Sequence, residues 1–255
     1  MFPRTGVCVL SIHLFPEDSA TNARRSRDAE PLLADLCEQL SAAHIPATWT
    51  LAAADLDATS EALSTQLAQS EVALLAERGW AGGQANRGQF AAGLAESLAR
   101  AAQTGRRPTT LAFEQCPAAL HDDLLVKYGI SAVCLPPAGR ALPFTWQTTL
   151  PASGCLRPLR WGLWKLEGAI DLFGVGWRRA AKAIDRAARE AGEVAITINL
   201  QKRSGGLKSV ARLLEHVTRL NGERQLTSQT LGSLVASRGA TRQIAAARSI
   251  LRSAA

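Results

Sequence analysis

No run of apolar residues in this sequence reaches the length of about 20 that a membrane-spanning helix needs. The first residues contain only a short apolar run at 7–12. They lack the basic lead and the small-residue cleavage site of a secretory signal. The sequence therefore predicts no membrane partner and a cytoplasmic location.

Closely spaced metal-binding and disulfide patterns are also missing. The five cysteines are odd in number and scattered, without a Cys-x-x-Cys pair: Cys8, Cys37, Cys116, Cys134 and Cys155. A structural zinc site or a disulfide framework needs paired cysteines, so we expect reduced, partly buried thiols. The glycines at 79–83 lack the following Lys-Ser/Thr of a phosphate loop. Only four histidines occur in the chain.

The composition is that of a globular protein. Apolar residues make up 47% of the 255 residues and charged residues 20%. We find no internal repeat and no linker long enough to separate two units, which predicts a single domain over 1–255. The net charge of +7 is concentrated near the end, where no acid follows Glu223, and predicts a basic C-terminal helix at about 239–253.

Strand and helix patterns alternate along most of the chain. Short apolar runs typical of buried strands occur at 7–12, 47–51, 71–75, 109–113, 130–135 and 194–200. Apolar residues recur at helical spacing at 28–43, 60–69, 89–104, 117–128, 178–191, 207–220, 227–236 and 241–252. The segment 136–176 is less regular. This alternation predicts parallel strands joined by helical crossovers.

Three local passages resemble one family. Residues 36–50 resemble the helix-to-strand passage of the polysaccharide deacetylases, also called the NodB-homology or carbohydrate esterase 4 family. Residues 71–75 resemble its third strand, and 124–133 resemble a later helix-to-strand passage. The resemblance implies an α/β fold, a distorted (β/α) barrel of about seven parallel strands, with its site at the carboxyl ends of the strands.

The resemblance also implies metal-assisted amide hydrolysis, but the residues that perform it in the family are missing here. The family has an Asp-Asp pair where this chain has His13 and Leu14, and two histidines where it has Leu75 and Gly79. The Arg-x-Pro-Tyr sequence that ends the family's fourth strand is absent at 111–117, and Asn199 or Gln201 replaces the late histidine. We therefore expect no bound metal and no other cofactor.

The remaining candidates are few. His13 takes the place of a family acid, Glu17 and Asp18 could form a reworked acid–base pair, and Glu114 ends the fourth strand. Trp80 and Trp146 fall in loops on the same rim, where an aromatic ring could stack on a sugar or cap the barrel. Ser11 and Ser131 have no paired His and Asp in the sequence pattern, so the pattern gives no support for a serine hydrolase.

Three hypotheses follow. The first is a catalytically degenerate deacetylase-like protein that acts as a carbohydrate-binding or scaffolding domain. The second is a hydrolase of C–N (acetamide) bonds in carbohydrates with a rebuilt site, which requires His13, Glu17, Asp18 and Glu114 to lie within hydrogen-bond reach. The third is an anion- or nucleic-acid-binding module that uses the basic C-terminal helix, although no recognised nucleic-acid module accompanies the charge.

Overall fold

A ten-stranded sheet organises the computed structural model, and its order along the sheet is β6-β7-β5-β4-β3-β2-β1-β9-β8, with β10 beside β1. The structure describes residues 5–14, 22–56, 61–68, 70–135, 155–200 and 206–240. The strands are β1 Gly6–His13, β2 Ala47–Leu51, β3 Glu71–Ala76, β4 Thr110–Phe113, β5 Ala132–Cys134, β6 Leu156–Pro158, β7 Trp164–Leu166, β8 Ile170–Asp171, β9 Glu193–Asn199 and β10 Leu226–Gln229. Every described strand pair is parallel except β6–β7.

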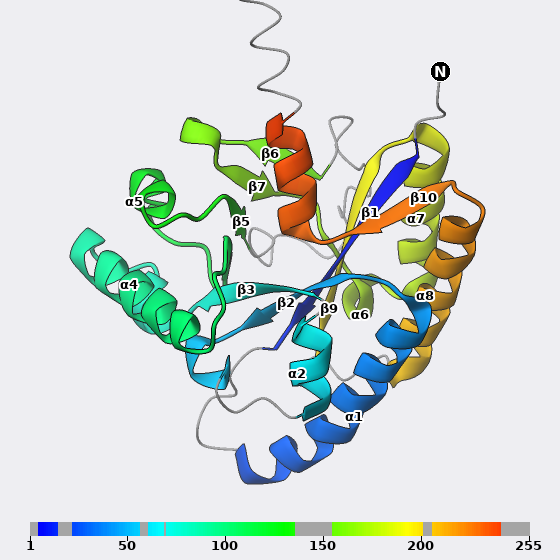
Figure 1. Ribbon diagram of the computed structural model, residues 1–255, viewed down its shortest axis with the longest axis horizontal. Helices are drawn as coiled ribbons and strands as arrows, with labels where there is room; N and C mark the ends of the chain where they lie inside the picture. The colour runs from blue at the N-terminus through cyan, green and yellow to red at the C-terminus, as the bar shows by residue number, and fades with distance from the viewer. Residues whose placement is uncertain are drawn as a thin grey trace, which may run out of the picture.

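Helices cover the outside of the curled sheet (Figure 1). They are α1 Asn22–Ala43, α2 Glu61–Ala68, α3 Arg78–Ala81, α4 Arg87–Gln103, α5 Asp122–Lys127, α6 Leu172–Val175, α7 Trp177–Glu190 and α8 Gly206–Gly222, with short 3-10 turns η1 Ala53–Leu56 and η2 Arg160–Gly162. The expected fold class, a distorted (β/α) barrel dominated by parallel strands, is confirmed. Of the helices in the described ranges, none combines the length and apolarity that a membrane crossing requires.

The C-terminal part differs from the prediction. The expected helix at 227–236 is wrong in its first half, because Leu226–Gln229 is strand β10 and a helix occupies 231–240. Strand β10 pairs with Gly6–Val9 of β1, while β2 pairs with Leu10–His13. Two strands thus share one edge of β1, which no local pattern indicates. The expected helix at 241–252, and most of the basic helix at 239–253, lie outside the described residues.

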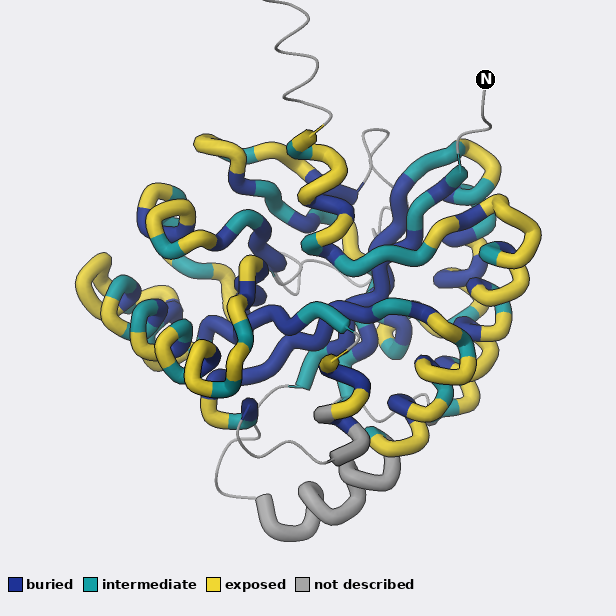
Figure 2. The backbone as a smooth tube through the Cα atoms, viewed as in Figure 1, coloured by how far each residue is buried: buried dark blue, intermediate teal, exposed yellow. Residues whose placement is uncertain are grey.

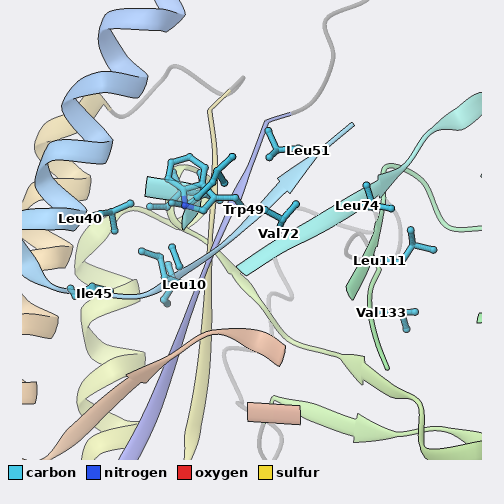
Figure 3. Packing of buried hydrophobic residues seen from close by; sticks show 14 of the residues in the cluster. Leu10, Leu40, Ile45, Trp49, Leu51, Val72, Leu74, Leu111 and Val133 are labelled. Atoms are coloured by element: carbon cyan, nitrogen blue, oxygen red, sulfur yellow. The ribbon is translucent and has the colours of Figure 1, made fainter. Parts of the chain in front are cut away.

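The two faces of the sheet bury different side chains. Residues Cys8, Leu10 and Ile12 of β1 belong to the large cluster between sheet and helices, which also holds the fully buried Trp49. Figure 3 shows Trp49 with Leu10 and Leu40 in this cluster. Val9 belongs to a second cluster on the interior face, together with small residues such as Ala112, Ala132, Cys134 and Ala195. Because side chains alternate along a strand, Ser11 and His13 also belong to this interior face.

Most of the cysteines are buried in these clusters. Four of them are buried, Cys116 is exposed, and all five are free thiols. Burial raises the pKa of Cys8 to about 12 and that of Cys37 to about 11, so both thiols are protonated at neutral pH. Cys8 and Cys37 therefore act as apolar packing residues of the large cluster.

Helix 231–240 lies at the amino-terminal end of the barrel, between β1 and the β6–β7 hairpin in Figure 1. Hydrogen bonds and an ion pair hold it there. The Glu71 carboxylate accepts hydrogen bonds from Thr48 Oγ1 at 2.9 Å, from Thr110 Oγ1 at 2.6 Å and from the Gly232 backbone N–H at 2.7 Å. At the other end of this helix, Arg238 forms an ion pair with Glu193, whose side chain is 3% exposed. Arg238 is itself exposed, but its charge is paired with a buried carboxylate of the fold.

Candidate functional site

The carboxyl ends of four neighbouring strands place polar side chains on the interior face of the barrel. His13 of β1 pairs with Thr50 of β2 on one side and with Asn199 of β9 on the other. We call the set the polar wall: Ser11, His13, Thr50, Asp171, Thr197 and Asn199. Their neighbours along the same strands, such as Trp49, Ile196 and Ile198, pack against the helices instead. In Figure 2 the strands that hold the wall run through the buried centre of the molecule.

His13 is the central residue of the polar wall. Its Nε2 lies 2.9 Å from Ser11 Oγ, and the two side chains are on the same face of β1. Burial lowers the pKa of His13 to about 4, although the nearby Asp171 carboxylate acts in the opposite direction. The imidazole is therefore neutral at pH 7. With the proton on Nδ1, the Ser11 hydroxyl donates to Nε2.

This contact corrects an expectation from the sequence. The pattern gives Ser11 no histidine partner, yet the structure places one two residues away on the same strand. A Ser and a His two positions apart do not form a recognised sequence motif of serine hydrolases. The signal that could have found them is the alternation of side chains along a strand.

Thr50 adds an unused polar group to the wall. Its side chain is fully buried, and its Oγ1 has no hydrogen-bond partner within the described part of the chain. A buried hydroxyl without a partner costs about 1–3 kcal/mol. The structure therefore places a hydrogen-bonding group next to His13 that a ligand could satisfy.

Three acidic residues follow the carboxyl ends of neighbouring strands: Asp55 after β2, Glu77 after β3 and Glu114 after β4. Burial raises the pKa of Glu77, and the carboxylates of Asp55 and Glu114 raise it further. Burial also raises the pKa of Asp55. Glu114 forms an ion pair with Arg78 at 3.2 Å. The sequence interpretation missed Asp55 and Glu77, although both follow a strand closely and so belong to the same rim.

Two of the site residues predicted from the sequence, His13 and Glu114, lie on strands that are not neighbours. His13 ends β1, whereas Glu114 follows β4, with β2 and β3 between them. Glu114 is hydrogen-bonded to Arg78 and makes no bond to His13. Glu17, Asp18 and Trp146 lie outside the described residues. Of the four residues predicted for a rebuilt C–N hydrolase site, the structure describes His13 and Glu114, and these two are not hydrogen-bonded to each other.

Trp80 lies in α3 and packs onto α4. Its ring centroid is 5.5 Å from that of Phe90, which in turn stacks on Phe113 at 6.3 Å. A Cβ at Gly93 would sit 2.3 Å from Trp80 Cγ. These contacts assign Trp80 to packing between α3 and α4.

The Gly93–Trp80 contact gives a direct test. Replacing Gly93 with alanine should lower the free energy of unfolding by about 1–3 kcal/mol, because the added methyl group overlaps the indole ring. Gly79→Ala is the matched control, since a Cβ there meets nothing within 4 Å. Chemical denaturation of both variants measures the difference. Equal stabilities would show that the α3–α4 contact is looser than the structure has it.

The residues at the family's metal positions do not fit a metal ion. Leu75 is fully buried on β3 and Gly79 lies in α3, so neither offers a ligand atom from its side chain. Within the described ranges, no group of three or more His, Cys, Asp or Glu side chains has the arrangement to hold a metal.

Comparisons with known proteins agree with this architecture. A Mycobacterium smegmatis protein assigned as a polysaccharide deacetylase matches with a TM-score of 0.66 and 12% identity, over 95% of this chain and 93% of that one. Puue allantoinase matches with a TM-score of 0.68 and 12% identity, over 92% and 90% of the two chains. The fold is that of the polysaccharide deacetylases.

A peptidoglycan deacetylase of the same fold, PdaC from Bacillus subtilis, matches with a TM-score of 0.56 and 14% identity over 97% and 98% of the two chains. The sequence itself matches no family model and no curated protein. The likeness to the deacetylases therefore lies in the arrangement of strands and helices.

Proposed function

We propose that this chain is a polysaccharide deacetylase-like protein without metal-dependent deacetylase chemistry, which binds carbohydrate at the carboxyl ends of its strands in the cytoplasm. The observation that supports this most directly is the combination of Leu75 and Gly79 at the metal positions with a polar wall beside them. Hydroxyl, amide and neutral imidazole groups suit the hydroxyl groups of a sugar, because each of them can both donate and accept hydrogen bonds. The deacetylase-fold neighbours agree with a carbohydrate ligand.

Sugar binding can be measured directly. Titration calorimetry with chitooligosaccharides should detect binding to the wild-type protein, and Asn199→Ala should weaken it about tenfold, the effect of one lost hydrogen bond of about 1.4 kcal/mol. Thr227→Val, on the exposed face of β10 at the opposite end of the barrel, is the control. Absence of binding to any neutral oligosaccharide would contradict the carbohydrate part of the proposal.

The absence of metal chemistry needs its own measurement. Protein equilibrated with zinc, nickel or cobalt and then desalted should hold no stoichiometric ion, and a chelator should leave the melting temperature unchanged. Acetylated chitooligosaccharides should release no acetate when these metals are added. One equivalent of bound metal, removed by a chelator with loss of stability, would refute this part.

A further inference from the structure

We propose that Ser11, His13 and Asp171 form a metal-independent acyl-transfer site, in which Ser11 is the nucleophile toward short-chain esters. This goes beyond the binding role, because it assigns a reaction to the polar wall. The Ser11 Oγ to His13 Nε2 distance of 2.9 Å lies within the range in which a base can take a proton from a serine hydroxyl. The neutral state of His13 at pH 7 leaves Nε2 able to accept that proton.

Asp171 supplies the third group. It ends β8, which pairs with β9, and Thr197 of β9 lies in register between Asp171 and Ser11. Its carboxylate acts electrostatically on His13 and favours the imidazolium form. Asp171 is itself held in place, because its Oδ1 accepts a hydrogen bond from the Phe173 backbone N–H at 3.2 Å. A fixed carboxylate of this kind stabilises the imidazolium that forms during acyl transfer.

Thr50 provides a donor for the developing negative charge. Register pairs Thr50 with His13 and places Thr48 beside Ser11, so the Thr50 hydroxyl is diagonal to the nucleophile on the interior face. Because Oγ1 has no partner within the described residues, it can donate to the oxygen of a tetrahedral intermediate. Its burial makes such a donor more effective than one in water.

The reaction balances without a metal or a redox partner. Ser11 Oγ bonds to the acyl carbon while its proton passes to His13 Nε2. The carbon–oxygen bond of the ester then breaks, and the departing alcohol takes the proton from His13. Water attacks the acyl-serine, gives a proton to His13, and releases the carboxylic acid as Ser11 regains its hydrogen.

The surroundings of Ser11 limit the acyl group. Ser11 is only 1% exposed, so a substrate must enter the barrel to reach it. On the amino-terminal side of Ser11 the interior is already filled, because Val9 of the same strand belongs to a buried cluster with Leu231 and Leu234 of helix 231–240. A long acyl chain therefore cannot extend into the barrel past Ser11, whereas an acetyl group does not need to. We therefore expect hydrolysis of 4-nitrophenyl acetate and none of 4-nitrophenyl octanoate.

The test combines a small serine reagent with four variants, all in the presence of a chelator. Methanesulfonyl fluoride, whose single methyl group matches that of an acetyl group, should label Ser11, located by peptide mass spectrometry, and should block hydrolysis of 4-nitrophenyl acetate. Ser11→Ala and His13→Gln should each lower hydrolysis at least about 100-fold, and Thr50→Val about tenfold or more. Asp171→Asn should move the pH dependence of kcat, the readout expected of a positioning residue. Ser131→Ala, away from the polar wall, should match the wild type.

Several results would overturn the proposal. They are absence of labelling at Ser11, labelling that persists in His13→Gln, and hydrolysis that is unchanged in folded Ser11→Ala. If Ser11→Ala does not fold, labelling of the wild type and of His13→Gln decides the question. Titration with chitooligosaccharides is independent of these readouts, so failure of the acyl-transfer site and failure of sugar binding are distinguishable.

Discussion

Arg238→Ala is expected to lower the free energy of unfolding by about 3 kcal/mol, because it leaves the Glu193 carboxylate buried without its cation. Arg238 Nε lies 2.6 Å from Glu193 Oε1, while Glu193 Oε2 accepts a hydrogen bond from the Cys155 backbone N–H at 3.2 Å. The pair therefore joins helix 231–240 to the start of β9 and to the chain before β6. Urea denaturation measures the loss.

Two further variants separate the ion pair from other effects. Arg189→Ala, on the exposed side of α7, should change stability by less than about 0.5 kcal/mol. Adding Glu193→Gln to Arg238→Ala should recover much of the loss, because the amide oxygen can still accept from the Cys155 N–H and no charge is left buried. A double variant no more stable than Arg238→Ala would show that packing of the Arg238 side chain dominates.

Acidification is expected to destabilise the protein through His13. Burial lowers its pKa from 6.5 to about 4 in the folded state. Between these pH values the unfolded chain binds more protons at this site, so the stability present above pH 6.5 falls as the pH approaches 4. The loss attributable to His13 reaches about 3 kcal/mol at the acid end of the window.

The His13→Gln variant isolates this contribution. Asp55 and Glu77 have raised pKa values in the folded state, so they bind protons before the unfolded chain does and act in the opposite direction as the pH falls. The difference between wild type and His13→Gln, measured by denaturation from pH 7 to pH 4, removes their effect. A difference that does not change with pH would mean that His13 is solvated in the folded protein.

Much of the architecture could be predicted from the sequence because its causes are local. The first five strands are short apolar runs that must be buried on both faces, and helical patterns separate them. Strand β10 was missed because Leu226–Gln229 has a polar sequence whose strand conformation depends on pairing with β1. The irregular segment at 136–176 likewise concealed β6, β7 and β8, which are two or three residues long.

The candidate site likewise combines features that are local in the sequence with features that depend on the tertiary structure. The sequence by itself determined that Leu75 and Gly79 offer no metal ligands and that His13 ends the first strand. Only the tertiary structure decided what surrounds His13. Asp171 reaches it from β8 through the pairing of distant strands, and the neutral state of the imidazole comes from burial by the whole barrel. Desolvation and strand pairing depend on residues far apart in the chain, so no local pattern encodes them.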